Sequence, residues 1–260
     1  MGVINITPDS FSDGGLYLNP LKAVQRANQQ LKEGVSILDI GAQSTRPGAE
    51  YIQPEIEWKR LFPALKAIRT EFPSALISVD TFSSTVASKA LQLGANWIND
   101  ISGGNRDPEI LKVVADANCP YVITHSRGNS KTMNQLCVYN HLINDILDEL
   151  NIATESALNS GILAENIIWD PGLGFAKDTN HNLEILRNLE VFTKAQYPIL
   201  VGPSRKRFIG EVLNEEDSEK RLFGTLAVIC RCIEAKVAIV RVHDIAPTFK
   251  TVQMAKCLWK

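Results

Sequence analysis

The sequence predicts an α/β fold of the TIM (β/α)8 barrel class, formed as one domain over residues 1–260. Short apolar segments alternate with longer amphipathic segments eight times along the 260 residues, and eight βα units in about 250 residues are typical of this barrel. Several apolar segments lack alternation, as expected of parallel strands that are buried on both faces. An open doubly wound sheet is the competing arrangement, but the GxGxxG turn that usually follows its first strand is absent.

The expected strands are short and rich in Ile, Val and Leu. In chain order they cover residues 2–6, 36–40, 76–79, 97–99, 121–124, 167–169, 199–201 and 238–242. Parallel neighbours of this kind need helical crossovers on the outside of the sheet. We therefore expect amphipathic helices between successive strands.

Helical spacing supports those crossovers. Apolar residues share one face in three segments, which contain Leu21, Val24, Ala27 and Leu31; Trp58, Leu61, Phe62, Leu65 and Ile68; and Leu222, Leu226, Ile229 and Ile233. Asn19-Pro20 and Asp107-Pro108 are start signals, because a capping side chain precedes a first-turn proline. Gly34 and Gly94 are stop signals.

Composition limits the class of function. The formal net charge of −2 and the pI near 6.1 give no basic excess that would indicate binding to nucleic acid or an anionic membrane. No apolar run reaches the roughly 18 residues of a membrane helix, and no signal peptide precedes the first strand. The five cysteines include no CxxC pair, which indicates a reduced, intracellular protein. The cytoplasm is the default compartment, and mitochondria would require a presequence outside this chain.

Polar side chains follow every expected strand. The active site of this barrel lies at the C-terminal ends of the strands, so these side chains would gather at one mouth. In strand order they include Asn5; Gln43, Thr45 and Arg46; Asp80; Asn99 and Asp100; His125 and Arg127; Asp170; Ser204, Arg205 and Lys206; and Arg241, His243 and Asp244. Any one of them has a structural explanation, such as a helix cap or a hydrogen-bonded core group. A set present at all the strand ends indicates a binding site.

These residues suit two kinds of chemistry. Cationic groups suit a phosphate or pyrophosphate, and they are Arg46, Lys206, Arg241 and His243. Amide and carboxylate groups suit the donor and acceptor edge of a flat heterocycle, and they are Asp80, Asn99 and Asp170. No His/Cys cluster has zinc spacing. The expected metal is Mg²⁺, held by Asn5 together with substrate phosphates.

The segment after the first strand has two interpretations. Residues 5–15 bring Asn5, Asp9 and Asp13 close together and end in Gly14-Gly15. Asp, Ser and Gly form turns readily, so the segment alone fits an ordinary polar turn. Beside seven other polar strand ends it fits the first βα loop of a barrel, with Asn5 fixed at the strand end and residues 9–15 as a moving part.

The whole motif set resembles one family. The motifs MGVINITPDSFSDGG, STRPG, SVDT, WIND, DPGLGF, SRK and RVHD, in this order and at this spacing, resemble dihydropteroate synthases over nearly the whole chain. The resemblance implies a transferase of folate biosynthesis that condenses 6-hydroxymethyl-7,8-dihydropterin pyrophosphate with p-aminobenzoate. It also implies bound Mg²⁺ and a homodimer, with no nucleic-acid or membrane partner.

The resemblance also implies roles for matching residues. The pterin contacts would be Asp80, Asn99, Asp170 and Lys206. The pyrophosphate and Mg²⁺ site would be Asn5, Arg241 and His243, with Asn5 as the metal ligand. The p-aminobenzoate pocket and its mobile loops would contain Phe11, Thr45, Arg46, Pro47, Phe175 and Ser204. Asp13 matches a loop carboxylate that closes over the reacting centre, and the catalytic candidates are Lys206, Asp13 and Arg46.

Some residues depart from the bacterial pattern of the family. Thr124-His125-Ser126-Arg127 stands where methionines are common, Gln43 replaces a common Glu, and Pro203 and Arg207 flank SRK. Three segments together look more like the eukaryotic enzymes, in which the domain is usually fused behind hydroxymethyldihydropterin pyrophosphokinase. They are His125-Ser126-Arg127, residues 170–177 (DPGLGFAK) and Gly202-Pro203-Ser204-Arg205-Lys206. We therefore expect a chain that is one domain of a longer protein, or a trimmed part of it.

Two other functions compete with this reading. A barrel that binds a pterin for methyl transfer, as in cobalamin-dependent methyltransferases, would share the Asp and Asn ring contacts but has no use for a pyrophosphate site. The SRK motif, Arg241 and His243 argue against it. A barrel that binds a pterin without turnover is the other alternative, but no expected site residue is missing.

Overall fold

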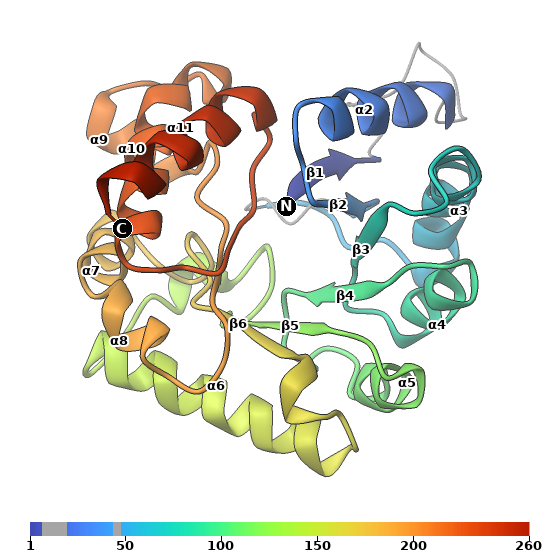
Figure 1. The fold of residues 1–260 in the computed structure, drawn as a ribbon. Helices are drawn as coiled ribbons and strands as arrows, with labels where there is room; N and C mark the ends of the chain where they lie inside the picture. Colours follow the sequence, from blue (N-terminus) through green and yellow to red (C-terminus); the bar gives the residue numbers. More distant parts are fainter. Residues whose placement is uncertain (7–19, 44–47, 260) are drawn as a thin grey trace.

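The computed structural model describes residues 1–6, 20–43 and 48–259 of the chain. Along these residues strands alternate with helices, and the helices lie outside the strands (Figure 1). The strands are β1 (Gly2–Asn5), β2 (Ile37–Gly41), β3 (Leu76–Asp80), β4 (Trp97–Asp100), β5 (Tyr121–Thr124), β6 (Ile167–Asp170), β7 (Leu200–Val201) and β8 (Ile239–Val240). Each expected strand is present, with bounds that shift by no more than two residues.

Helices connect the strands as the apolar spacing predicts. The α-helices are α2 (Pro20–Lys32), α3 (Pro54–Glu71), α4 (Ser84–Gln92), α5 (Glu109–Ala117), α6 (Leu142–Asn159), α7 (Thr179–Arg187), α8 (Leu189–Thr193), α9 (Arg207–Leu213), α10 (Leu222–Glu234) and α11 (Ile245–Leu258). Short 3₁₀ helices are η1 (Met133–Gln135), η2 (Ala164–Asn166) and η3 (Ser218–Arg221). Within the described residues, no helix combines the length and the apolar character needed to cross a membrane.

The strands close into a ring. β1 to β6 pair in parallel in chain order, and β7 pairs in parallel with β8. Isolated parallel bridges join the two sheets at Trp169–Ile199 and Gly2–Val242. At the second junction the Val3 N–H donates to the Val242 carbonyl oxygen at 2.9 Å. The prediction of a TIM barrel is therefore confirmed.

The strand register shows which side chains face the barrel interior. Successive residues of a strand point to opposite faces, and paired positions of neighbouring strands point the same way. Val122, Ile168 and Leu200 form an apolar cluster that also contacts Met1, Trp97 and Ile239. Since these residues come from or adjoin six different strands of a closed ring, the cluster lies inside it.

The same alternation makes the C-terminal end of the interior polar. The inward positions there hold Asn5, Asp80, Asn99, Thr124, Asp170 and Arg241. The other face of each strand packs against helices, and Ile4, Ile40, Ile98 and Ile123 belong to that outer core. An apolar base under a polar mouth is the arrangement that this fold uses for an active site.

Three expectations about the helices need correction. Leu21 was expected on the core face of α2, but it is 68% exposed while Ala27 is fully buried. Phe62 was expected on the core face of α3, but it is 38% exposed while Leu65 is fully buried. Fewer positions of α3 therefore face the core than the apolar residues of its sequence indicate. Asp107 was expected to cap its own helix, but its carboxylate accepts the Ser84 N–H of α4 at 2.7 Å. Asn19, the other expected cap, lies outside the described residues.

The glycine stop signals are confirmed. Gly34 and Gly94 follow α2 and α4 with φ of +95° and +97°, a backbone conformation that favours glycine.

Candidate functional site

An ion-pair network crosses the polar mouth. The Arg241 guanidinium donates from Nη2 to Asp80 Oδ2 at 2.7 Å and from Nε to Asp39 Oδ2 at 2.6 Å. The Asn99 side chain donates to the same Asp39 oxygen at 3.2 Å. Three predicted site residues therefore lie around Asp39, a fully buried carboxylate of β2 that was not among the predicted site residues.

Pairing offsets the cost of burying these charges. Burial raises the pKa of Asp80 above its usual range, and the Arg241 guanidinium opposes that shift. Burial also disfavours the charged guanidinium, but Asp39 and Asp80 hold the pKa of Arg241 above its ordinary value. Removing one partner of such a group would leave an uncompensated buried charge. The Arg241 ion pair therefore favours the ionised, accepting form of Asp80, against the burial that favours its protonated form.

Asp170 ends β6 in a tight turn. Its Oδ1 accepts the Gly172 N–H at 2.7 Å, and the residue is only 7% exposed. Gly172 has φ of +70°, and a Cβ there would overlap the His125 carbonyl oxygen, so the turn requires glycine. Burial raises the pKa of the Asp170 carboxyl, and its hydrogen bond to Gly172 opposes the shift.

Lys206 links two loops of the mouth. Its ammonium donates to the Leu173 carbonyl oxygen at 2.7 Å and lies 4.4 Å from the centre of the Phe175 ring. Burial lowers the pKa of Lys206 to about 8. The structure thus brings together Lys206 and Phe175, which the sequence assigned to two different subsites.

The turn that carries Lys206 is strained and held from several sides. Arg205 has φ of +61°, in the left-handed region that non-glycine residues rarely adopt. Its guanidinium pairs with both carboxylate oxygens of Asp244, at 2.6 and 3.0 Å. Its backbone N–H donates to Thr225 Oγ1 at 3.1 Å, and its carbonyl oxygen accepts from Arg221 at 3.2 Å. Strain of this kind persists only where the surroundings enforce it.

Ser204 and His243 meet at the neighbouring strand ends. The His243 backbone N–H donates to Ser204 Oγ at 3.1 Å, and the ring Nδ1 lies 3.0 Å from the same oxygen. A serine hydroxyl that accepts the backbone hydrogen can donate its own hydrogen to Nδ1. That arrangement favours the tautomer of the His243 ring that carries its proton on Nε2.

Sequence reasoning missed Lys177, which is 2% exposed. Its ammonium lies 2.8 Å from His125 Nδ1, and it donates to the carbonyl oxygens of Phe175 at 2.9 Å and Gly172 at 3.1 Å. Burial lowers the pKa of Lys177 to about 7. It fixes the loop that carries Asp170 and Phe175. The signal in the sequence was a lysine placed directly after a glycine-rich apolar turn.

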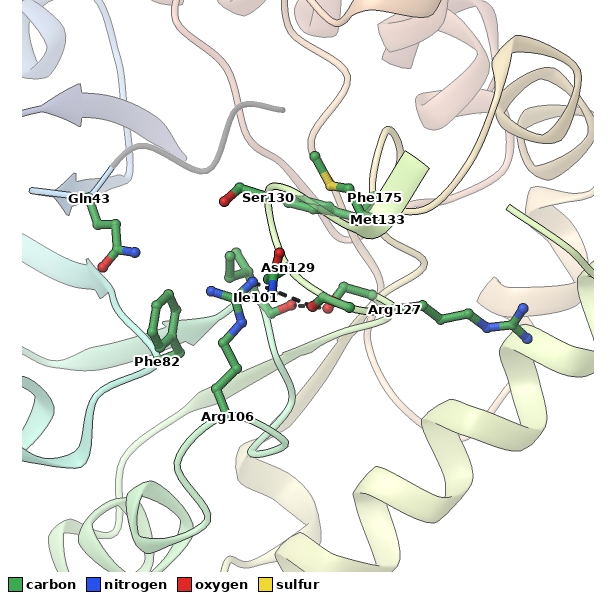
Figure 2. A pocket seen from close by; sticks show the side chains of 11 residues that line it. Gln43, Phe82, Ile101, Arg106, Arg127, Asn129, Ser130, Met133 and Phe175 are labelled. Carbon is green, nitrogen blue, oxygen red and sulfur yellow. Dashed lines mark hydrogen bonds between the residues drawn. The ribbon is translucent and has the colours of Figure 1, made fainter. Parts of the chain in front are cut away.

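The contact between Lys177 and His125 is the first of a series of polar contacts that extends to α6. His125 Nε2 lies 3.1 Å from Glu149 Oε2, and Arg127 Nε donates to Glu149 Oε1 at 3.0 Å. Burial lowers the pKa of His125 to about 4, so the ring is neutral. Figure 2 shows the Arg127 side chain directed toward α6 rather than into the pocket. His125 and Arg127 therefore stabilise the loops of the polar mouth from the side of α6.

Glu57 is a second buried group that sequence reasoning missed. It lies in the first turn of α3 and is 2% exposed. Burial raises its pKa to about 7, against a hydrogen bond from Thr81 and with a further increase from Asp80. Nothing in the local sequence distinguishes it from Glu55, which lies two residues earlier and is exposed.

A pocket opens beside Phe175, between the loops that follow β2 to β6. Figure 2 shows Gln43 and Phe82 on one side of it and Phe175 and Met133 on another. Arg106 lies over the Phe82 ring, 4.5 Å from its centre. An adjoining cavity of about 470 Å³ includes Phe82 and Arg106 in its walls. Neither cavity is lined by the polar residues of the mouth, which are Asp80, Asn99, Asp170, Lys206 and Arg241.

Several predicted site residues cannot be placed. Phe11, Asp13, Thr45, Arg46 and Pro47 lie outside the described residues. Asn5 ends β1 and is half-buried. Across residues 1–6, 20–43 and 48–259, no group of three or more His, Cys, Asp or Glu side chains could hold a metal ion.

Comparison with known proteins points to one family. The sequence profile of a family described as pterin binding enzyme matches residues 1–243. The dihydropteroate synthase of Synechocystis is 43% identical over 260 residues, which are 100% of this chain and 90% of that protein. The folate synthesis bifunctional protein of Arabidopsis thaliana is 44% identical over 258 residues, covering 94% of this chain and 53% of that protein.

The fold agrees with a solved structure of the same kind. The crystal structure of dihydropteroate synthase from Clostridium difficile, determined in the presence of pteroic acid, superimposes with a TM-score of 0.93 at 36% identity. The match covers 100% of this chain and 95% of that one.

Proposed function

The chain belongs to the dihydropteroate synthase family of pterin-binding enzymes, and we propose which of its side chains serve the reaction of that family. The enzyme joins 6-hydroxymethyl-7,8-dihydropterin pyrophosphate to p-aminobenzoate and yields 7,8-dihydropteroate and pyrophosphate, a step of folate biosynthesis. One observation carries the assignment: inside a closed barrel, acidic and amide groups on β3, β4 and β6 face cations from the β7 and β8 side.

Asp80, Asn99 and Asp170 bind the polar edge of the pterin ring. Carboxylates accept hydrogen bonds from ring N–H and exocyclic amino groups, and the Asn amide both donates and accepts. Asn99 and Asp170 are less than a tenth exposed, so a ring without the matching edge would leave them unpaired. The ion pair with Arg241 favours the ionised, accepting form of Asp80.

The pyrophosphate lies toward β1 and β8. These strands are neighbours, so Asn5 at the end of β1 is on the same side of the mouth as Arg241 and His243. The His243 ring is oriented by Ser204. Lys206 approaches from the β7 loop and borders both the pterin and the leaving group. Cations aimed at the oxygen where charge develops lower the barrier to its departure.

Mg²⁺ is proposed as the metal of this reaction, with Asn5 as its protein ligand. Its amide oxygen is a hard ligand, and the described residues offer no cluster that could hold a metal without substrate. A cation that keeps its waters and shares phosphate oxygens suits such a donor set. When bound, it would supply charge neutralisation for the departing pyrophosphate.

The chemical step exchanges one bond at the pterin methylene carbon for another. The bond from this carbon to the pyrophosphate oxygen breaks with its electron pair on the oxygen. The amine nitrogen of p-aminobenzoate forms the new bond and releases one proton to water. An arylamine is uncharged at neutral pH, so positioning matters more than deprotonation.

Positioning of the arylamine is assigned to the loops of the mouth. Phe175, held by Lys206, provides an apolar wall, and Ser204 provides a hydroxyl nearby. The remaining assignments rest on the sequence, and they are Phe11, Asp13, Thr45, Arg46 and Pro47 as the loop residues that close over the substrates. Closure would exclude the water that competes with the arylamine for the methylene carbon.

We further propose that the enzyme is a homodimer. Apolar side chains are exposed on α10 and α11, which pack side by side (Figure 1). Phe223 is 81% exposed, Met254 61% and Leu258 60%. Introducing a charge by Phe223→Glu should convert dimers to monomers in light scattering, and an unchanged mass would place the interface elsewhere.

Fusion and compartment are proposed from relatives. The bifunctional Arabidopsis protein is about twice the matched length, which supports a natural chain that also carries hydroxymethyldihydropterin pyrophosphokinase. An intracellular compartment is proposed, and a related bifunctional protein named as mitochondrial supports that organelle as the alternative to the cytoplasm.

The assignment is tested by turnover and by one substitution. The protein is incubated with pterin pyrophosphate, Mg²⁺ and p-aminobenzoate, and dihydropteroate is measured. Asp170→Asn should raise the KM for the pterin at least tenfold and leave the KM for p-aminobenzoate unchanged, because only the ring contact is altered. Product formation by the variant at wild-type efficiency would refute the assignment of Asp170.

A further inference from the structure

One buried hydroxyl at the polar mouth makes no hydrogen bond within the described residues. Thr124 is the last residue of β5, and Val122, two residues earlier, belongs to the apolar cluster inside the barrel. Because side chains alternate along a strand, Thr124 also faces the interior. Its register partner on β6 is Asp170, so the two side chains lie side by side on the same face.

The Thr124 hydroxyl is buried without a partner. The residue is 3% exposed, and Oγ1 has no hydrogen-bond partner among residues 1–6, 20–43 and 48–259. A buried hydroxyl without a hydrogen bond destabilises the protein that carries it. Native structures retain few such groups, and the exceptions call for an explanation.

The neighbouring Asp170 and Asn99 side chains, by contrast, have protein partners. Asp170 Oδ1 accepts from the Gly172 N–H at 2.7 Å, and the Asn99 amide donates to Asp39 at 3.2 Å. Backbone hydrogen bonds also tie the end of β5 to β6, where the His125 N–H donates to the Asp170 carbonyl oxygen at 2.9 Å. The strand is therefore fixed, and Thr124 Oγ1 has a fixed position from which it can meet a ligand.

We propose that Thr124 is a further specificity-determining residue, whose hydroxyl hydrogen-bonds the polar edge of the flat heterocycle held by Asn99 and Asp170. The inference rests on the proposed function of this mouth and adds one contact to it. A hydroxyl both donates and accepts, so it can pair with a ring nitrogen, an N–H or an exocyclic group. A purely apolar ring would leave it unpaired and would be rejected.

The test compares two variants of similar shape. Thr124→Val removes the hydroxyl and keeps the branched side chain, whereas Thr124→Ser keeps the hydroxyl. Affinity for pterin pyrophosphate is measured by calorimetry with Mg²⁺ present, together with KM values for both substrates and the melting temperature of the free protein. Thr124→Ala replaces the valine variant if that protein does not fold.

A contact with the ligand and a contact within the fold predict different results. We expect Thr124→Val to bind the pterin pyrophosphate about fivefold to tenfold more weakly, to keep its KM for p-aminobenzoate and to match or exceed the wild-type melting temperature. Thr124→Ser should bind within about twofold of wild type. A lower melting temperature together with unchanged affinity would mean a structural hydrogen bond and would overturn the inference, as would unchanged affinity alone.

Ser78 is a matched control. Its hydroxyl is also buried and without a partner in the described part of the chain, but it lies on β3 two residues before Asp80, deeper in the barrel. Ser78→Ala should leave pterin affinity unchanged. Equal weakening by Ser78→Ala and Thr124→Val would overturn the inference, because a general loosening of the barrel would explain both.

Failure of the inference is distinguishable from failure of the proposed function. Wild-type protein that neither binds the pterin pyrophosphate nor forms dihydropteroate would overturn both. Normal wild-type binding and turnover, with Thr124→Val unchanged, would overturn the role of Thr124 alone.

Discussion

Lys206 provides a test of the cationic side of the mouth through its pKa. Burial lowers that pKa from 10.5 to about 8. At about 1.4 kcal/mol for each pKa unit, keeping the charge there costs roughly 3 kcal/mol compared with a lysine in water. In the free enzyme the side chain is therefore cationic below pH 8 and increasingly neutral above it. A neutral amine attracts the pyrophosphate far less.

The pH dependence follows with a definite sign. The kcat/KM for pterin pyrophosphate reports groups of the free enzyme. It should be level below about pH 8 and should fall towards tenfold for each further pH unit. Lys206→Arg should move that fall above about pH 10, since a guanidinium stays charged. Lys206→Ala should lower kcat/KM by roughly 10- to 150-fold at pH 7, which corresponds to the 1.5–3 kcal/mol of a charged hydrogen bond.

The assay is initial-rate formation of dihydropteroate between pH 6 and 10. Lys112, which is well exposed on α5, supplies the control, and Lys112→Arg should leave the profile unchanged. The reasoning is refuted if Lys206→Arg keeps the wild-type fall near pH 8, or if Lys206→Ala stays within threefold of wild type.

Three other substitutions test groups around the site. Burial raises the pKa of Glu57 to about 7, so the folded state favours its neutral form and the resulting loss of stability grows as pH rises from about 4.5 to 7. Glu57→Gln should therefore melt several degrees higher than wild type at pH 8 and at the same temperature as wild type at pH 4. A difference in melting temperature that does not change with pH would contradict this. Asp107→Ala should remove the acceptor of the Ser84 N–H and lower stability by about 1 kcal/mol in denaturant titrations, with no change disproving the cap. Asp244→Asn should weaken the clamp on Arg205 and raise the KM for the pterin about tenfold, and an unchanged KM would show that the turn holds without it.

Periodicity and strand-end chemistry were sufficient to predict the barrel. The prediction rested on eight apolar segments separated by amphipathic ones and followed by polar residues, and the structure places those residues at the C-terminal ends of the strands. The ends of the strands were less predictable. β8 is limited to Ile239–Val240, although the backbone stays hydrogen-bonded beyond it. The Arg241 N–H donates to the Val201 carbonyl oxygen at 2.9 Å, and Val242 forms an isolated bridge to Gly2.

The interactions behind the mouth were not predictable, because they join residues far apart in sequence. Asp39 and Arg241 are separated by 202 positions, and neither neighbourhood indicates the pair. Lys177 is buried among carbonyl oxygens, although lysine side chains usually lie at the protein surface. Asp107 precedes its own helix as a capping residue would, but its carboxylate accepts the N–H of Ser84 at the start of the neighbouring helix α4. All three interactions depend on which distant segments the fold brings together, and the local sequence does not contain that information.

The short pair of β7 and β8 has a consequence for how the enzyme opens. Only Leu200–Ile239 and Val201–Val240 are paired within it, and isolated bridges connect it to β6 and β1. Local unfolding begins where few backbone hydrogen bonds cooperate. Amide hydrogen exchange should therefore be faster in this pair than in β2 to β5. Because Lys206 follows β7 and Arg241 follows β8, such an opening would loosen the cationic side of the mouth before the strands that carry Asp80 and Asn99.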